Sequence, residues 1–454
     1  IEAGEWLDEL APTTVTLGLG AVRLPIITSA RFNSARRLTR AGLSLSRGAF
    51  ALEGVDLEVT GSSGIDCGSA VHVEGGDLLV RDASIAMSTT AVCRVGVIML
   101  DDTAGSTLSL VRSEVIGMAG DWSSTRVTVA GIATDGADSI VMTDSSVVGV
   151  RRSAVGGDRP ADYIAALTDV GGARIRISRS SLHSVFTGID GAPAIHLTDG
   201  ITAALDLQGS PDVFIDNSVL TTPNGGDENK VVVLQAEDSI LRLIHTTAQL
   251  GSDFRPSGPP EARGLRSAVV SIGGRLRRVV LANNLLAHAD FGAWTEFMTV
   301  LDLSELAMGA PQSESFVRGN AFSEPPPQML DLPANPLVVC SLDGEFSFLA
   351  VDETTANDRA NYLCRTGGSI DVGGNYVLYR LVMRSAFETR GAVTLDGDGR
   401  VAAGTGNTFA GTVSLLRTGG TPHLSPIPAA EVAVDRSGAA HNPTAPVVGA
   451  WVIP

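Results

Sequence analysis

A short phrase of alternating apolar and polar residues recurs along the chain. Each copy reads apolar-x-apolar, then a short polar step, then an aliphatic residue, as in LVRDASIAM (79–87) and LVRSEVIGM (110–118). We take the aliphatic residue after the polar step as the anchor of each repeat, and neighbouring anchors are 29 to 37 residues apart. The anchors are Val55, Ile85, Val115, Val147, Leu182, Val219, Ala248, Leu285 and Phe322. A fixed phrase at a period of this size predicts a solenoid.

A second apolar segment and a Gly or Asp turn precede each anchor, as in SAVHVEGGDLLV (69–80) and SAVVSIGGRLRRVV (267–280). Runs of four or five residues rich in Val, Ile and Leu, bounded by Gly and Asp, indicate strands rather than helices. The fixed frame of leucine-rich repeats and the helix pairs of ankyrin and TPR repeats are absent. Each repeat is therefore predicted to be one coil of a parallel β-helix, stacked at roughly 4.8 Å per coil. The anchor would place one aliphatic residue inward at the same corner of every coil.

Over roughly 42–322 the chain resembles the right-handed parallel β-helix proteins of bacterial surfaces. The closing segment VDRSGAAHNPTAPVVGAW (434–451) is similar to the end of the choice-of-anchor Q kind. The matching residues are Asp435, Gly438, Pro446, Gly449, Ala450 and Trp451. The resemblance implies an all-β, right-handed solenoid of about ten or more coils, secreted from or displayed on a bacterium.

The rhythm of the phrase divides the chain into four parts. Residues 1–41 lack the phrase and are expected to cap the first coil, and 42–322 hold the coils. Residues 323–369 begin with SEPPPQMLDLPANP and are expected to be a Pro-rich, Cys-containing insertion, because proline cannot donate to a ladder. Residues 370–454 are expected to hold the final coils and the closing segment.

Composition narrows the classes of partner. Hydrophobic residues make up 44% of the 454 residues but aromatic residues only 5%, so aliphatic side chains are expected to fill the core. A formal net charge of −17 opposes binding to nucleic acid or to an anionic membrane surface. No apolar run is long enough for a transmembrane helix. Lys230 is the single lysine among 33 basic residues, which we attribute to codon usage. The chain opens on Ile1, which leaves an upstream segment and export open.

The chain has four cysteines, and their positions favour two disulfides. Cys67 and Cys93 fall in the variable loops of successive coils, and Cys340 and Cys364 enclose a loop in the insertion. A bridge around a loop of about 25 residues contributes roughly 3–4 kcal/mol in the chain-entropy model. Four buried free thiols in a cytoplasmic protein are the alternative.

The variable loops that follow the anchors hold the candidate chemistry. Neighbouring coils could place loop carboxylates about 5 Å apart, near the separation of a retaining glycosidase pair, and carboxylates also bind Ca²⁺. Asp190, Asp227 and Arg159 are the catalytic candidates, and Asp227 and Asp253 are the calcium candidates. Calcium is the one cofactor expected. Such loops equally suit a plain surface, which is the simpler interpretation.

Aromatic side chains supply the candidates for sugar binding. Trp122 and Trp294 lie in variable loops and are the candidate platforms, whereas Tyr163 stands at a strand start and is expected in the core. No nucleophile motif, P-loop or metal motif occurs.

Three functions remain open. The first is an extracellular or cell-surface structural or adhesive protein without a catalytic centre, which binds a glycan or a protein or assembles with copies of itself. The alternative is a polysaccharide lyase or glycoside hydrolase of the pectin-lyase-like fold. A calcium-stabilised surface module is the third possibility.

Overall fold

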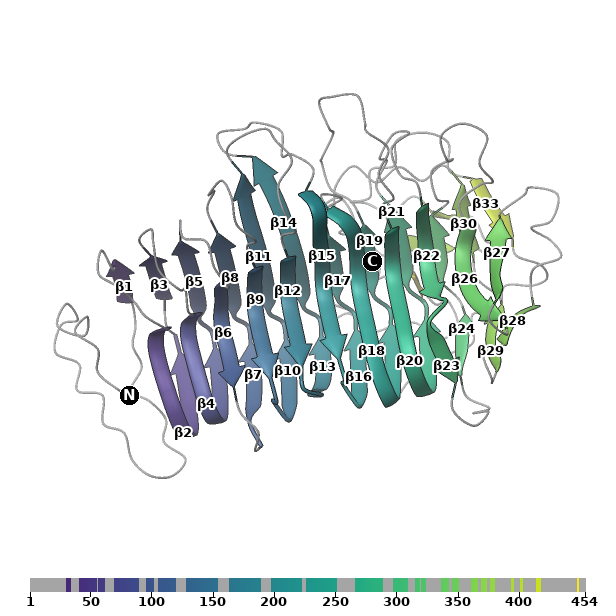
Figure 1. The fold of residues 1–454 in the computed structure, drawn as a ribbon. Helices are drawn as coiled ribbons and strands as arrows, with labels where there is room; N and C mark the ends of the chain where they lie inside the picture. Colours follow the sequence, from purple (N-terminus) through teal and green to yellow (C-terminus); the bar gives the residue numbers. More distant parts are fainter. Residues whose placement is uncertain are drawn as a thin grey trace.

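The computed structural model describes the strands of the chain and many of the turns between them. The described residues are 30–33, 41–54, 56–61, 69–89, 95–101, 105–119, 128–153, 163–188, 197–222, 226–250, 266–288, 297–308, 315–318, 320–323, 336–342, 345–350, 361–365, 369–373, 376–379, 393–395, 401–402, 414–417 and 447–448. Within them every element is a strand and none is a helix. Figure 1 shows strands of successive repeats stacked side by side.

Twelve short strands form one sheet, which we call the narrow sheet. Its strands pair in parallel from β1 to β30, and only β33 is antiparallel to its neighbour. In spatial order they are β1 (Ala30–Asn33), β3 (Asp56–Gly61), β5 (Ser84–Thr89), β8 (Glu114–Ala119), β11 (Ser146–Ser153), β14 (Ser181–Gly188), β17 (Val219–Thr222), β19 (Thr247–Leu250), β21 (Leu285–His288), β25 (Ala321–Ser323), β30 (Tyr376–Tyr379) and β33 (Ser414–Arg417).

A sheet of nineteen strands, the wide sheet, holds the other strands of each repeat. Five of them are long: β2 (Ala41–Glu53), β4 (Ser69–Arg81), β15 (Leu197–Gln208), β18 (Gly226–Ile244) and β20 (Arg266–Ala282). Those up to β16 are β6 (Val95–Asp101), β7 (Thr107–Val111), β9 (Thr128–Asp135), β10 (Ser139–Thr143), β12 (Tyr163–Val170), β13 (Arg174–Ser178) and β16 (Asp212–Asp216). The later ones are β22 (Phe297–Leu303), β23 (Leu306–Met308), β24 (Phe316–Arg318), β26 (Pro336–Leu342), β27 (Glu345–Ala350), β28 (Asn361–Arg365) and β29 (Ser369–Gly373).

The chain visits both sheets in every repeat. For example, β9 and β10 of the wide sheet lead through a two-residue corner into β11 of the narrow sheet, and β12, β13 and β14 repeat that path one strand further on. Parallel pairing between equivalent strands of successive repeats is consistent with a parallel β-solenoid. The fold is therefore all-β with parallel sheets, as the sequence predicts.

The pairing register of the narrow sheet shows whether the predicted anchors occupy equivalent positions in successive strands. Six of them occupy one row of paired positions in successive strands: Ile85, Val115, Val147, Leu182, Ala248 and Phe322. The first five are also fully buried, so the expectation of one inward aliphatic residue per repeat is confirmed for them.

Two anchors are wrong, Val219 and Leu285, because the row contains instead Leu220 and Leu286, which pair with Leu182 and Ala248. Val55 lies outside the described residues, and Leu57 is the residue that pairs with Ile85 in this row. At each corner that the structure describes, the residue of this row stands three positions after a residue with positive φ, such as Asn217 before Leu220. Backbone conformation, rather than the length of the polar step, therefore sets the register.

The core lies between the two sheets and is aliphatic. A single cluster of buried Leu, Ile, Val and Ala side chains extends from Leu43 to Val317 with few aromatic members, as the composition predicts.

The predicted cap and insertion both contain strands. β1 lies within 1–41 and pairs in parallel with β3. In 323–369, β26 and β27 pair in antiparallel fashion, while β26 also extends the wide sheet beside β22. Beyond these, β31 (Val393–Leu395), β32 (Val401–Ala402) and β34 (Val447–Val448) form a small antiparallel sheet. The four-part division stays a prediction.

Candidate functional site

The corner between the wide and narrow sheets has an unusual backbone. One residue of each repeat there has φ between +47° and +63°. These residues are Gly54, Asp82, Arg112, Asp144, Arg179, Asn217, His245 and Asn283. Asp, Asn and Gly adopt this left-handed conformation readily, but arginine does so at a cost. The N–H groups of Arg112 and Arg179 donate to the carbonyls of Thr143 and Asp216 in the next repeat, at 3.0 and 3.1 Å, which holds the conformation in place.

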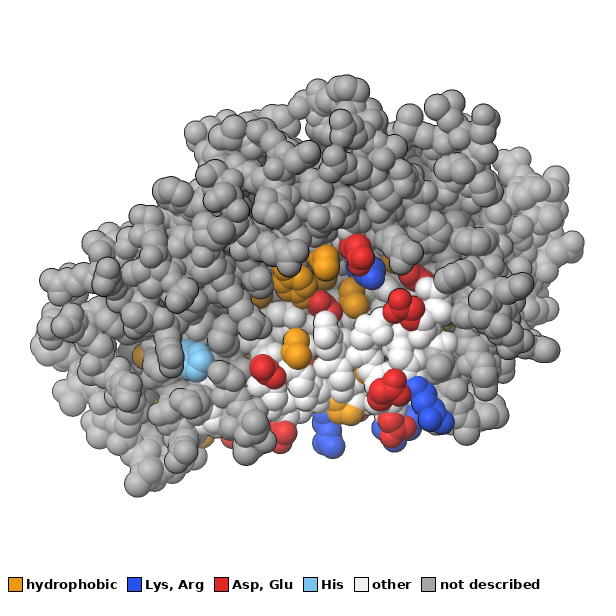
Figure 2. All heavy atoms as spheres, viewed as in Figure 1, with side chains coloured by type: hydrophobic (Ala, Val, Ile, Leu, Met, Phe, Trp, Pro, Cys, Tyr) orange, Lys and Arg blue, Asp and Glu red, His pale blue; other side chains and the backbone are white. Residues whose placement is uncertain are grey.

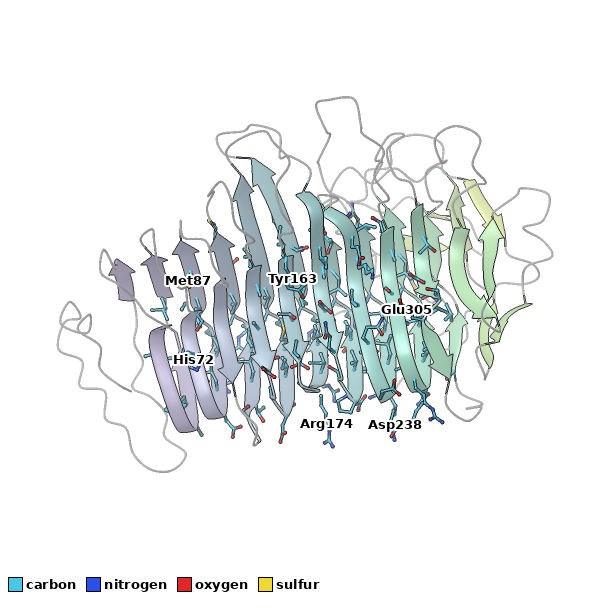
Figure 3. The ribbon with its side chains drawn as sticks, in the orientation of Figure 1. His72, Met87, Tyr163, Arg174, Asp238 and Glu305 are labelled. Atoms are coloured by element: carbon cyan, nitrogen blue, oxygen red, sulfur yellow. The ribbon has the colours of Figure 1, made fainter. Side chains whose placement is uncertain are left out.

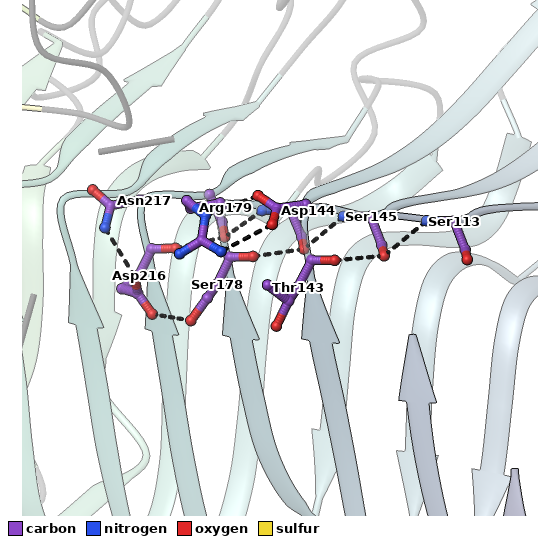
Figure 4. Close-up of polar contacts among 10 residues, drawn as sticks. Ser113, Thr143, Asp144, Ser145, Ser178, Arg179, Asp216 and Asn217 are labelled. Atoms are coloured by element: carbon purple, nitrogen blue, oxygen red, sulfur yellow. Dashed lines mark hydrogen bonds and ion pairs between the residues drawn. The ribbon is translucent and has the colours of Figure 1, made fainter. Parts of the chain in front are cut away.

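From Ser113 onward the residue after each corner residue is polar, and these residues form a buried ladder (Figure 4). The N–H of Ser113 donates to Ser145 Oγ at 3.2 Å, and the N–H of Ser145 donates to Ser180 Oγ at 3.2 Å. Each serine hydroxyl in turn donates to the carbonyl two residues earlier, at 2.9 Å for Ser145 and Thr143. Ser218, Thr246, Asn284 and Asn320 continue the ladder. The ladder satisfies backbone groups that would otherwise be buried without partners.

The side chains of the corner residues pair from repeat to repeat on the surface. Arg112 donates two bonds of 2.7 Å to the Asp82 carboxylate, and Arg179 donates bonds of 2.8 and 2.9 Å to Asp144. The bond from Arg112 is the main reason that the pKa of Asp82 lies below its usual range. These residues line an open depression of about 710 Å³. Its arginines are already paired with carboxylates of the neighbouring repeat. These side chains therefore join repeats.

A second cluster lies on the outer face of the wide sheet, where the strands bend. In five successive strands two consecutive residues belong to the core, although a straight strand would alternate: Ala166–Leu167, Ala204–Leu205, Val231–Val232, Val269–Val270 and Val300–Leu301. The bend makes the outer face concave. Figure 2 shows acidic, basic and hydrophobic side chains side by side over part of this view of the molecule.

Tyr163 and Asp206 meet across this concave face. Tyr163 is in register with Ile201, and Asp206 stands five residues beyond Ile201, roughly 16 Å away along a straight strand. Nevertheless the Tyr163 hydroxyl donates to Asp206 Oδ2 at 2.6 Å. The bend of β12 and β15 brings the two positions together. Tyr163, which the sequence placed in the core, is instead half-buried on the outer face (Figure 3).

Lys230 of the next strand completes the cluster. Its ammonium pairs with Glu228 at 3.4 Å, and its charge reaches Asp206. Burial raises the pKa of Asp206, while the Tyr163 hydroxyl, the Lys230 charge and Gln208 each lower it in part. Asp206 is 7% exposed, and its Oδ1 has no hydrogen-bond partner. The cluster thus combines a carboxyl group of raised pKa, a phenol and an ammonium group.

Two further buried carboxyl groups hold turns together. Asp169 accepts from the N–H of Ala173 at 2.9 Å and from Ser210 Oγ at 3.2 Å, and burial is the main reason that its pKa is raised. Asp216 accepts from Ser178 and Asn217 at the corner, and burial again raises its pKa. Because their hydrogen bonds join neighbouring repeats and the turns beside them, both act as structural residues.

Most of the sequence-predicted site residues lie outside the described residues. These are Asp190, Arg159, Asp253, Trp122, Trp294, Cys67 and Cys93. The backbones of Asp227, Cys340 and Cys364 are described, in β18, β26 and β28, but their side chains are not. The catalytic, calcium, sugar-binding and disulfide assignments to these residues stay predictions.

Sequence reasoning missed the part played by Asp206, Tyr163 and Lys230. The signals were present, since Lys230 is the single lysine and Asp206 is a lone acid in the apolar run TAALDL. The contact between residues 43 positions apart was not readable from any pattern.

Within the described ranges no group of three or more His, Cys, Asp or Glu side chains could hold a metal ion. The same ranges contain no helix long and apolar enough to cross a membrane. No family model, curated protein or solved structure matches the chain.

Proposed function

We propose that this chain is a right-handed parallel β-helix of about ten or more coils that acts as a structural and adhesive module, secreted or on a bacterial surface, without a catalytic centre. The handedness follows the strong preference of parallel crossover connections. The partner would be an extracellular glycan or protein, or further copies of the chain in a surface assembly.

The observation that carries the proposal is the continuous corner. From Ser113 to Asn320 every ladder side chain except that of Thr246, which bonds within its own repeat, bonds to an adjacent repeat. Ion pairs such as Arg179 with Asp144 add to this on the surface. A catalytic centre needs polar groups that converge on one substrate atom, whereas these groups extend in a row and join repeats. A stiff, elongated support is what such an arrangement favours.

The surface location rests on sequence features. An acidic chain with four cysteines and few aromatic residues suits an oxidising exterior, and the closing segment resembles that of bacterial surface β-helix proteins. Calcium bound by loop carboxylates remains part of the proposal as a stabilising ion, which a chelator-induced fall in Tm would reveal.

The test is a panel of neutral and anionic polysaccharides, followed for new reducing ends and for unsaturated products by ultraviolet absorbance. We expect binding to one or more glycans with no product. Product from any substrate would overturn the structural proposal and favour the alternative below.

A polysaccharide lyase or glycoside hydrolase is the second candidate, and Asp206 is the observation that favours it. A carboxyl group of raised pKa beside a phenol and an ammonium group has the types needed for general acid–base chemistry. If product forms, its loss in Asp206→Asn but not in Asp238→Asn would assign the activity to this cluster.

A further inference from the structure

A second outer surface of the wide sheet carries exposed arginine side chains. It is formed by the outward residues of β10, β13 and β16 and of the second halves of β18 and β20, which the register places in parallel rows. Burial alternates along β13, so Arg174 and Arg176 are exposed while Ile175 and Ile177 belong to the core. We call this surface the arginine face. Arg174 lies at the lower edge of the stack in Figure 3, where its side chain points away from the strands.

Arg174 and Arg176 differ from most arginines of the described strands. Within the described part of the chain, neither side chain makes a hydrogen bond or an ion pair. By contrast, each of five other arginines pairs with a carboxylate: Arg81, Arg112, Arg179, Arg242 and Arg277. Two guanidinium groups two residues apart on one strand are therefore available to an anion from outside.

Phe214 holds one of these guanidinium groups in place. The ring is in register with Arg176 of β13 and Arg242 of β18, and their Cζ atoms lie 5.3 and 4.8 Å from its centre. Arg242 also donates to Asp212 at 3.1 Å, so its charge is already balanced. The ring attracts a cation through its face and does not occupy the fork of N–H donors. Arg176 is thus positioned by the ring and still offers its fork to a ligand.

The nearby acids do not occupy these two arginines. Asp216 is 6% exposed and accepts from Ser178 and Asn217, and the charge of Arg176 reaches it without a described ion pair. The carboxylate of Asp138 lies beside Gly105 of the preceding repeat, on the side away from β13. The local charge of the face is therefore positive around Arg174 and Arg176.

The surface beside the arginines is open. Ser139 and Val141 of β10 are in register with Arg174 and Arg176, and both are half-buried. The next strand, β7, continues these rows with Thr107 and Ser109, which are also half-buried. All of these side chains are short, so an extended ligand can lie across β7 and β10 with its charged groups against the arginines.

We propose that the arginine face binds the carboxylate groups of an acidic polysaccharide, with Arg174 and Arg176 as the residues that contact them. A guanidinium fork matches a carboxylate in bidentate fashion. The inference rests on the adhesive function proposed above and names the face and the class of glycan.

The net charge of −17 selects among polyanions. At physiological ionic strength, charges more than about 8 Å away are largely screened, so the local arginines decide the interaction once the ligand is in contact. On approach, a densely charged polymer such as nucleic acid is repelled more strongly than a sugar chain with a single carboxylate on each unit. Charge complementarity therefore favours the sparsely charged glycan.

Fluorescence anisotropy with labelled hexasaccharides tests the proposal. The probes are hexamers of galacturonate, glucuronate and mannuronate, each compared with its carboxyl-reduced form of equal length. We expect at least one acidic hexamer to bind roughly tenfold more tightly than its reduced form, and this preference should shrink as salt rises from about 0.05 to 0.5 M. Dextran sulfate and single-stranded DNA serve as the densely charged comparisons.

Variants assign the binding to this face. Arg174→Gln and Arg176→Gln should each weaken binding of the acidic hexamer roughly three- to fivefold, and the double variant about tenfold or more. Arg275→Gln is the matched control, because Arg275 is exposed in the turn of β20 beside Glu237 and its loss changes the charge equally. All three side chains are exposed, so the urea midpoints should stay at the parent's value and show that the fold is kept.

The outcomes separate the face from the function. Binding of an acidic hexamer that is lost in the double variant and kept in Arg275→Gln supports the proposal. Glycan binding that the double variant leaves unchanged overturns this face and leaves the adhesive function standing. Equal affinity for the carboxyl-reduced form, or tighter binding of dextran sulfate or DNA, overturns the class of ligand. Failure of every probe and of the polysaccharide panel overturns both proposals.

Discussion

Replacement of Asn284 by alanine tests whether the corner ladder holds the repeats together. The Asn284 side chain donates to the Leu243 carbonyl and to Asn320 Oδ1, both at 2.8 Å, and accepts from the N–H of Thr246 at 2.9 Å. The residue is fully buried, so water cannot replace these bonds without a structural change. Its loss removes the acceptor of the Thr246 N–H and a donor to the Leu243 carbonyl, both in the preceding repeat.

The magnitude follows from those three bonds. A typical intramolecular hydrogen bond contributes about 0.5–1.5 kcal/mol net, and a buried group left unsatisfied costs about 1–3 kcal/mol. Asn284→Ala is therefore expected to lower the free energy of unfolding by about 2–4 kcal/mol. Ser145→Ala, which removes two bonds, should cost less.

Equilibrium urea denaturation followed by circular dichroism measures the change. Ser109→Ala is the matched control, because Ser109 lies half-buried in β7 with no described side-chain bond. If Asn284→Ala unfolds at the same urea concentration as the control, the ladder does not stabilise the stack and the reasoning is refuted.

Three further predictions follow from other parts of the structure. In Gly149→Ala the new Cβ would lie 1.9 Å from the carbonyl oxygen of Ala165, so we expect a loss of about 3 kcal/mol in urea denaturation; unfolding at the parent's urea concentration would contradict it. Burial raises the pKa of Asp206 above its ordinary value, so the folded state binds the proton more tightly, and stability falls as pH rises through the folded pKa. Asp206→Asn should therefore gain stability relative to the parent between acid and neutral pH, and a pH-independent difference in urea midpoint would count against this. The exposed Arg112–Asp82 pair should contribute little: Arg112→Gln should shift Tm slightly at low salt and not at all at about 1 M salt, and a shift that persists in salt would show another role.

The sequence predicted the repeats well where side-chain polarity and backbone conformation agree. Ile85 and Leu182 follow long polar steps and lie where the pattern placed them. At Val219 and Leu285 the polar step is one residue shorter, so the pattern chose the residue before the anchor. The positive φ values of Asn217 and Asn283 identify the residues three positions later as the true anchors. The sequence does not show which asparagine in a polar step adopts the left-handed conformation.

The cluster on the outer face was less predictable. The rarity of Lys230 was visible, but its meaning depends on Asp206, which lies in another strand. The contact of Asp206 with Tyr163 depends on the bend at Ala204–Leu205, where two consecutive small or aliphatic residues face inward. The same run of apolar residues is also compatible with a straight, fully buried strand, so the bend could not be predicted from the sequence.

The fixed distance from corner to anchor has a consequence for how such a protein changes length. Repeat lengths vary, from 28 residues between Leu57 and Ile85 to 38 between Leu182 and Leu220, yet the three residues after each corner do not. Recombination between equivalent corners, such as Asp144 and Arg179, would remove or duplicate one whole repeat and leave every ladder position occupied. Each repeat gained or lost in the gene would lengthen or shorten the protein by one strand spacing, roughly 4.8 Å. The number of repeats would therefore set the length of the stack.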